Sequence, residues 1–403
     1  MKNSCVMWPH FTKYLFVLFL LLPSIGYAAS IFDTTIVPAD AKPDAYLPLL
    51  KGKKVALVIN QTSVIGNVSL LDLMLKNNIH IVEIFVPEHG FRGKEDAGVK
   101  VDNIIDSATN IPVISLYGSH KKPTEKDIAD VDIVVYDLQD VGLRFYTYIS
   151  TLEYCMEACA EQGRQFVVLD RPNPNGFYVD GPVLEKENRS FVGMQPIPIV
   201  YGMTAGEYAA MIKGEQWFHK ADSLDLTVIK CYNYAHPKKY RLPVAPSPNL
   251  RTMAAVYAYP SLCLFEGTPV SVGRGTLLPF QQFGCPGFEG KFTYSFTPHS
   301  GAGAKSPPYD NKQCFGTLIG NDENEVLREI NNKFCLKWLI EAYNAYPDKE
   351  KFFTPFFVKL SGTSKLKTQI INGDSESHIR DGWKDDISAF KKIRKKYLLY
   401  PDF

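Results

Sequence analysis

The sequence predicts an α/β fold, with a doubly wound parallel sheet over residues 30–180 followed by an α+β domain over residues 181–403. Short, nearly continuous apolar runs rich in β-branched residues recur in the first part, as is typical of strands buried on both faces. Helical patterns separate several of these runs, and such alternation favours parallel strands with helices on both faces. Beyond residue 181 the pattern changes to proline-rich connections with isolated helices and strands.

Five strands are expected in the first domain, at residues 55–59, 81–86, 112–116, 133–136 and 166–169, with helices at 69–76 and 148–161. In the second domain, Thr204 followed three residues later by Glu207 predicts a helix start, because this pair forms a capping box. Further helices are expected at 338–343 and 387–397.

The first 28 residues have the order of a secretory signal peptide. Lys2 and Lys13 precede an apolar run at 14–22, and small residues lead to a cleavage site after Ala28. The apolar run is about half the roughly 20 residues that span a bilayer. We therefore expect an exported protein, periplasmic or secreted, without stable membrane insertion after cleavage.

The composition of the sequence argues against two kinds of binding partner, nucleic acids and metal ions. Lys and Arg number 44 and Asp and Glu 43, and no basic stripe with interleaved aromatic residues occurs, so a nucleic-acid partner is not expected. The paired Cys or His spacings of structural zinc sites are also missing from the sequence, so no metal is expected.

The polar residues that directly follow the predicted strands are the candidates for chemistry, because open parallel sheets bind ligands beyond the carboxyl ends of their strands. Glu266 and Arg274 are the best candidates from the second domain. The candidates at the strand ends are Asn60, Glu88, His89, Arg92, Asp137, Gln139, Asp140, Arg144, Tyr146, Asp170, Arg171 and Asn173.

Several enzyme classes are disfavoured by the motifs. The first strand is followed by Asn60-Gln-Thr-Ser-Val-Ile-Gly66 and not by G-x-G-x-x-G, which disfavours a nicotinamide enzyme. G-x-S-x-G, a P-loop and H-E-x-x-H do not occur either. Catalysis by carboxylates is then the remaining possibility. Glycoside hydrolysis is consistent with the carboxylates at the strand ends, because it needs an acid at the leaving oxygen and usually a second carboxylate.

Ordered motifs over nearly the whole chain after residue 28 resemble those of the exo-β-N-acetylmuramidases of the NamZ type. They include Pro87-Glu-His-Gly-Phe-Arg-Gly93, Asp137-Leu-Gln-Asp-Val-Gly142, Asp170-Arg-Pro-Asn-Pro-Asn175 and Ser271-Val-Gly-Arg-Gly-Thr276. The resemblance implies a Rossmann-like N-terminal domain, a smaller C-terminal domain and an active site in the cleft between them. It also implies release of terminal N-acetylmuramic acid (MurNAc) from peptidoglycan-derived glycans without a metal or organic cofactor.

With this resemblance, Glu88 is the leading acid/base, and Asp137 or Asp140 is the expected second carboxyl; the sequence does not choose between them. That group could act as nucleophile or as base for water, or the substrate's own 2-acetamido oxygen could assist. The expected substrate-binding residues are Asn60, His89, Arg92, Gln139, Arg144, Tyr146, Asp170, Arg171, Asn173, Glu266 and Arg274, with the arginines recognising the lactyl carboxylate.

Two other functions stay open. One is an exported β-hexosaminidase that prefers N-acetylglucosamine (GlcNAc), and the other is a non-catalytic muropeptide-binding protein. The sequence does not determine the oligomeric state.

Overall fold

The computed structural model describes residues 1–2, 30–91 and 103–403. The chain forms two units, residues 1–31 and residues 32–403. The predicted signal peptide therefore lies, from residue 3 onward, outside the described residues, and so does Arg92. Within the described ranges, no helix is both long enough and apolar enough to cross a membrane.

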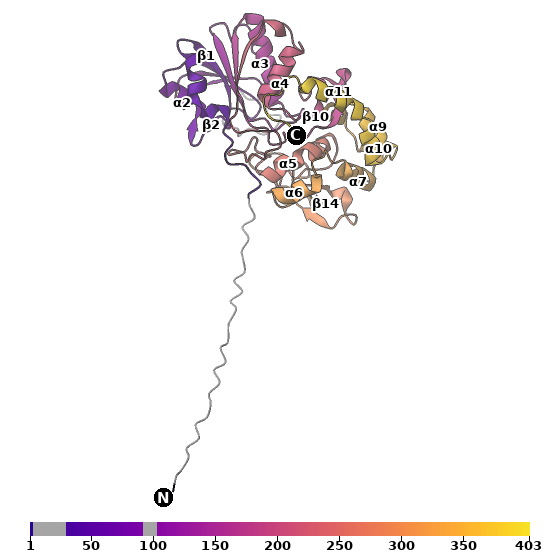
Figure 1. Ribbon diagram of the computed structural model, residues 1–403. Coiled ribbons are helices and arrows are strands. Elements are labelled where there is room, and N and C mark those ends of the chain that lie inside the picture. The colour runs from indigo at the N-terminus through magenta and orange to yellow at the C-terminus, as the bar shows by residue number, and fades with distance from the viewer. Residues whose placement is uncertain (3–29, 92–102) are drawn as a thin grey trace. The chain divides into compact units, whose positions relative to one another are not determined.

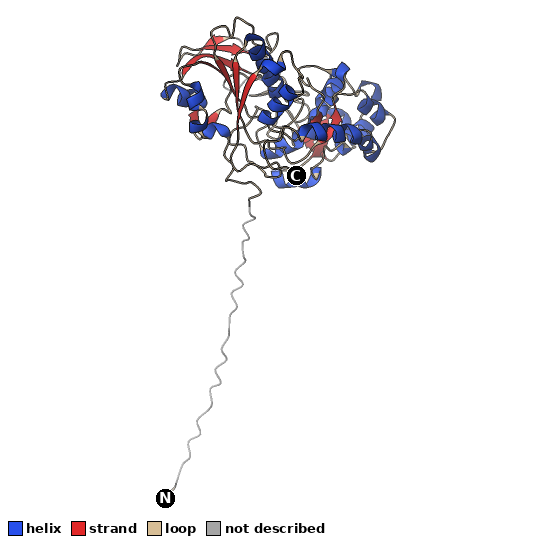
Figure 2. Cartoon of the chain, turned by 45° about the horizontal axis from the view of Figure 1, so that its top comes forward, coloured by secondary structure: helices blue, strands red, loops and turns tan. Residues whose placement is uncertain are grey.

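The largest sheet among the described residues has seven strands in the order β11-β8-β7-β1-β4-β6-β5 (Figures 1 and 2). All neighbouring strands in it run parallel except β5, which is antiparallel to β6. This sheet confirms the α/β class and each of the five predicted strands. Its strands are β1 (Lys54–Ile59), β4 (His80–Val86), β5 (Ile104–Ile105), β6 (Pro112–Ser115), β7 (Ile133–Asp137), β8 (Gln165–Leu169) and β11 (Asp225–Ile229).

Alternate side chains of each central strand enter two different hydrophobic cores. In β1, Ala56 and Val58 join one core, whereas Val55 and Leu57 join the other. The first core also contains α3 (Tyr148–Gln162) and α4 (Ala205–Gly214), and the second contains α2 (Leu70–Lys76) and α1 (Leu47–Leu50). Figure 1 shows α3 and α4 on one side of the sheet and α2 on the other. Because both faces are covered, the central strands consist mainly of apolar residues.

Local signals define the ends of these helices. The Ser69 hydroxyl accepts a hydrogen bond from the Asp72 amide at 3.0 Å and caps α2. At the start of α4 the predicted capping box of Thr204 and Glu207 is present. The α3 helix ends at Gly163, whose φ of +63° places it in the left-handed region that favours glycine.

Strand β11 was not expected from the sequence. It lies beyond residue 180 and pairs in parallel with β8 at the edge of the sheet. As an edge strand it is only partly buried, so its sequence Asp-Leu-Thr-Val-Ile lacks the continuous apolar run of the central strands. The division into domains at 30–180 and 181–403 stays a prediction.

The remaining elements are helices with small antiparallel sheets. The helix predicted at 338–343 is confirmed within α7, and the one predicted at 387–397 begins and ends three residues earlier, as α11. The helices are α5 (Met253–Leu262), α6 (Glu323–Ile330), α7 (Lys337–Ala345), α8 (Pro355–Ser361), α9 (Lys365–Ile371), α10 (Glu376–Asp381) and α11 (Lys384–Arg394). The strands are β2 (Val64–Ile65), β3 (Val68–Ser69), β9 (Asp180–Val183), β10 (Pro198–Val200), β12 (Gln282–Cys285), β13 (Tyr294–Phe296) and β14 (Cys314–Leu318).

Short 3-10 helices complete the chain: η1 (Ala39–Ala41), η2 (Pro43–Ala45), η3 (Lys186–Asn188), η4 (Ala221–Ser223), η5 (Cys263–Gly267), η6 (Pro286–Phe288) and η7 (Lys349–Lys351). Of these, η5 directly continues α5. It is the element that carries Glu266.

Candidate active site

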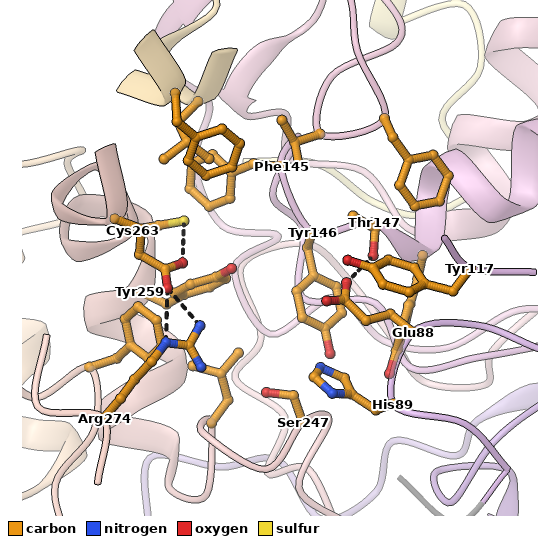
Figure 3. Close-up of a pocket in the computed structure, with 18 of the residues that line it drawn as sticks. Glu88, His89, Tyr117, Phe145, Tyr146, Thr147, Ser247, Tyr259, Cys263 and Arg274 are labelled. Carbon is orange, nitrogen blue, oxygen red and sulfur yellow. Dashed lines mark hydrogen bonds and ion pairs between the residues drawn. The ribbon is translucent and has the colours of Figure 1, made fainter. Parts of the chain in front are cut away.

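A cavity of about 530 Å³ is lined by residues from both halves of the sequence (Figure 3). The first half contributes the segments that follow β4 and β6 and the segment that leads into α3. The second half contributes α5, η5 and the loop that holds Arg274. The lining residues used below are Glu88, His89, Tyr117, Lys121, Tyr146, Thr147, Tyr148, Phe191, Tyr259, Cys263, Glu266, Arg274 and Phe280.

Glu88 follows β4 and is presented to the cavity by a tight turn. His89 adopts a φ of +73°, which is unusual for a residue with a side chain, and the Gly90 amide donates to the Pro87 carbonyl at 3.1 Å. Non-glycine residues in this conformation cluster at functional sites, where the surrounding structure holds them in place. The turn therefore holds Glu88 and His89 side by side at the carboxyl edge of the sheet.

Two hydroxyl groups hold the Glu88 carboxyl group. Thr147 Oγ1 donates to Glu88 Oε2 at 2.9 Å, and the Tyr117 hydroxyl donates to the same side chain. Burial raises the pKa of Tyr117 above its ordinary value, and the negative charge of Glu88 raises it further, so Tyr117 keeps the proton that it donates. In Figure 3, Glu88, Thr147 and Tyr117 lie together on one side of the cavity.

The opposite side of the cavity contains a second carboxylate, that of Glu266. Arg274 binds its Oε1 atom twice, through Nε at 2.8 Å and Nη2 at 2.7 Å. The Cys263 thiol lies 3.7 Å from Oε2 and donates a weak hydrogen bond to it. Figure 3 shows Cys263 and Arg274 across the cavity from Glu88. Glu88 and Glu266 are the two acidic side chains among the described residues that line this cavity.

Tyrosine rings form the wall between the two carboxylates. The rings of Tyr146 and Tyr148 pack at 4.7 Å, and their hydroxyls both donate to the Pro246 carbonyl, at 2.8 and 3.1 Å. Behind them, Asn60 donates to the Tyr148 hydroxyl at 2.8 Å. Asn60 thus orients a lining residue and does not itself line the cavity. Aromatic faces of this kind suit the apolar faces of sugar rings.

Five of the predicted site residues line this cavity: Glu88, His89, Tyr146, Glu266 and Arg274. The structure does not bring the others into the lining. The predicted role of Arg92 cannot be compared with the structure, because Arg92 lies outside the described residues. The catalytic or binding role of every one of these residues stays a prediction.

Asp137 is part of a buried ion-pair network. Arg171 donates to Asp137 through Nε at 2.5 Å and Nη2 at 2.9 Å, and Nη2 also binds Asp40 at 2.6 Å. All three side chains are almost completely buried. Because both carboxylate oxygens of Asp137 are bonded to Arg171, this network links the ends of β7 and β8 to η1.

Asp140 and Asp170 are also enclosed by protein donors. Asp140 accepts from the Tyr201 hydroxyl and from the Gly142 amide at 2.6 Å. Asp170 accepts from the Gly206 amide at 2.8 Å and so helps to cap α4. Burial raises the pKa of each aspartate to about 6. Both groups are therefore bonded inside the protein and lie away from the cavity lining.

The amide and guanidinium candidates are bonded to backbone carbonyls. Gln139 donates to Pro172 at 2.9 Å, and Asn173 donates to Met203 at 2.7 Å. Arg144 is fully buried, and burial lowers the pKa of its guanidinium. Its two terminal nitrogens donate to the carbonyls of Pro182, Ile197, Leu360 and Ser361. Arg144 thus joins segments more than 200 residues apart in sequence.

Sequence reasoning missed Tyr117, Lys121, Thr147, Tyr259 and Cys263. Tyr117 follows the third predicted strand directly, and that position was the available signal for it. Tyr259 and Cys263 lie in the almost wholly apolar segment of α5 and η5, where nothing distinguishes a lining residue from a core residue. In the ranges that the structure describes, no group of three or more His, Cys, Asp or Glu side chains is placed to hold a metal ion.

The fold and this cavity define an α/β protein with two carboxylates in an aromatic pocket, the set of groups that glycoside hydrolases use. Comparison with known proteins agrees with this class. The N-terminal and C-terminal models of the family described as "Exo-beta-N-acetylmuramidase NamZ" match residues 55–254 and 257–400. The chain belongs to this family.

Relatives of known sequence or structure cover most of the chain. It is 38% identical over 390 residues to the "Peptidoglycan beta-N-acetylmuramidase NamZ" of Bacillus subtilis (strain 168), and the match covers 89% of each protein. Crystal structures of two DUF1343 family proteins from Bacteroides fragilis NCTC 9343 have a similar fold. Their TM-scores are 0.84 and 0.76, at 48% and 28% identity, and each match covers 91% of this chain and 99% of the other.

Proposed function

We propose that this protein is an exo-β-N-acetylmuramidase that hydrolyses terminal non-reducing β-MurNAc from peptidoglycan fragments. The observation that carries the proposal is the pair Glu88 and Glu266, one carboxyl group on each side of a single aromatic cavity. Membership of the NamZ family supports the same substrate. The site of hydrolysis in this proposal is the cavity between residues of the two halves of the sequence.

In this proposal Glu88 is the general acid that protonates the oxygen of the scissile bond. Thr147 and Tyr117 hold its carboxyl group in one orientation, as an acid needs if it is to meet the leaving oxygen. Glu266 is the second carboxyl group and takes the role for which the sequence suggested Asp137 or Asp140. It acts as nucleophile, as base for water, or as the group that orients an assisting acetamido oxygen.

The test of this function is hydrolysis of a chromogenic β-MurNAc glycoside beside its β-GlcNAc counterpart. We expect kcat/KM to be at least about tenfold higher for β-MurNAc, because a charge-assisted hydrogen bond to the lactyl carboxylate contributes about that much. A higher specificity constant for β-GlcNAc would favour the β-hexosaminidase alternative, and equal constants would contradict recognition of the lactyl carboxylate. Binding of MurNAc without any turnover would favour a non-catalytic muropeptide-binding protein.

We also propose that the protein is exported and acts on cell-wall fragments in the periplasm or outside the cell. The support is the signal-like order of residues 1–28. Mass spectrometry of the native N-terminus is expected to show Ala29 as the first residue, because the predicted cleavage follows Ala28. Material that retains Met1 and is extracted only by detergent would contradict both cleavage and release from the membrane.

A further inference from the structure

The charged groups of the cavity raise the question of which one recognises an acidic substrate. Arg274 and Lys121 carry the permanent positive charges among the described lining residues. The charge of Arg274 is already matched, because two of its three guanidinium nitrogens bind Glu266. A substrate carboxylate at Arg274 would therefore also face the negative charge of Glu266.

Lys121 is in a different electrostatic position. Its ammonium lies 4.9 Å from the centre of the Phe191 ring, and its side chain is half-buried. The acidic groups of the neighbouring helix α3 are bonded elsewhere: Glu157 and Glu161 bind Lys122, at 3.3 and 2.8 Å. In the parts of the chain that are described, Lys121 thus has an aromatic partner but no carboxylate partner.

The remaining acidic residue of α3 is Glu153, which lines a neighbouring surface pocket together with Lys121. It accepts hydrogen bonds from Gln195 at 2.5 Å and from the Tyr208 hydroxyl at 3.2 Å. Burial raises its pKa to about 7, so a proton reduces its negative charge at neutral pH. A half-buried ammonium without an anionic partner attracts an anion, and the aromatic ring beneath it leaves its donors available.

Lys121 is also connected to the proposed acid through two aromatic rings. The Tyr117 hydroxyl binds Glu88, and the Tyr117 ring packs against Phe191 at 6.1 Å. The ammonium of Lys121 in turn lies over the Phe191 ring, in a cation–π contact. Lys121 and Glu88 thus line the same cavity and are linked to each other through Tyr117 and Phe191.

We propose that Lys121 is the residue that selects MurNAc over GlcNAc, by binding the carboxylate of the lactyl group. This inference rests on the proposed function. MurNAc differs from GlcNAc by a lactyl ether, whose carboxyl group is ionised at neutral pH. The ammonium of Lys121 donates to that carboxylate, while Glu266 and Arg274 remain paired with each other.

The test compares a chromogenic β-MurNAc glycoside with its lactyl methyl ester, in which the negative charge is removed and the sugar is kept. We expect Lys121→Met to lower kcat/KM for the free acid by about tenfold to hundredfold, the effect of one charge-assisted hydrogen bond. Turnover of the ester should stay within about threefold of the native protein. Lys121→Arg should keep most of the preference for the acid, because it retains the positive charge.

Lys122→Met is the matched control, because it removes the neighbouring lysine, which binds Glu157 and Glu161 outside the cavity lining. It should leave both rates unchanged. A Lys121→Met protein that keeps the native preference for the acid, or that loses both substrates equally, overturns the role of Lys121. Failure of the native protein to hydrolyse either glycoside would instead overturn the proposed function and the role of Lys121 with it.

Discussion

Glu88→Gln is expected to lower kcat by at least about 10²-fold and to leave the fold intact, because general acid–base assistance contributes about 10²–10⁴ in rate. Glutamine keeps the size of the side chain and can still accept the hydrogen bond that Thr147 donates at 2.9 Å. Its amide group is not acidic enough to protonate the leaving oxygen. The measurement is kcat on a chromogenic β-MurNAc glycoside, with the melting temperature taken on the same preparation.

Asp137→Asn is the comparison variant, because the sequence also suggested Asp137 for catalysis. Asp137 is buried and bonded to Arg171, so its neutralisation should cost about 1.5–3 kcal/mol of stability, the range for charge-assisted hydrogen bonds. Its folded fraction should keep kcat within a few fold. The reverse result, a destabilised but active Glu88→Gln protein, would move the acid role to Asp137, Asp140 or Glu266.

Glu266→Gln is expected to have the second large effect, a loss of at least about 10²-fold in kcat, since a second carboxylate that serves as base or nucleophile has no substitute in glutamine. The amide oxygen can still accept from Arg274, which binds Glu266 Oε1 at 2.8 Å, so the loop should keep its conformation. Steady-state kinetics on the native protein and the variant test this. The anomeric form of the first-released MurNAc, followed by NMR, separates retention from inversion.

Glu323→Gln provides the matched control, because Glu323 is paired with Arg241 and lies outside the cavity lining. Loss of an exposed ion pair of this kind changes stability by about 0–1 kcal/mol and should leave kcat unchanged. If Glu266→Gln raised KM and kept kcat, Glu266 would be a binding residue. The second catalytic group would then be sought in the substrate's acetamido oxygen.

The sequence alone determined most of the sheet and the position of Glu88. Central strands are buried on both faces, so each is a short run of mainly apolar residues, and such a run can be recognised without knowledge of its partner strands. The end of a strand is equally local, and Glu88 follows β4 with one residue between them. The start of α4 was predictable for the same reason, because both members of its capping box lie within four residues.

Only the tertiary structure decided which polar residues face the cavity. Asp137 and Glu88 both lie at the carboxyl edge of the sheet. Asp137 is bonded to Arg171, which follows the neighbouring strand β8, whereas Glu88 accepts hydrogen bonds from two hydroxyl groups at the cavity. Arg144 was expected among the binding residues, and it instead binds carbonyls from segments that are distant in the sequence. Whether a polar side chain faces the cavity or is bonded inside the protein depends on the donor or acceptor that packs against it.

The lining residues on the Glu266 side of the cavity could not be recognised from the sequence, for a related reason. Tyr259 lies in α5 and Cys263 in η5, and both elements are almost completely buried, so the residue types and spacing are those of an ordinary core. Lys121 and Lys122 are adjacent in the sequence and differ only in the side chains around them. Lys122 forms ion pairs with two glutamates, whereas the ammonium of Lys121 lies over an aromatic ring at the edge of the cavity. Secondary structure follows from local patterns of burial, whereas the chemistry of a charged side chain is set by partners that only folding brings to it.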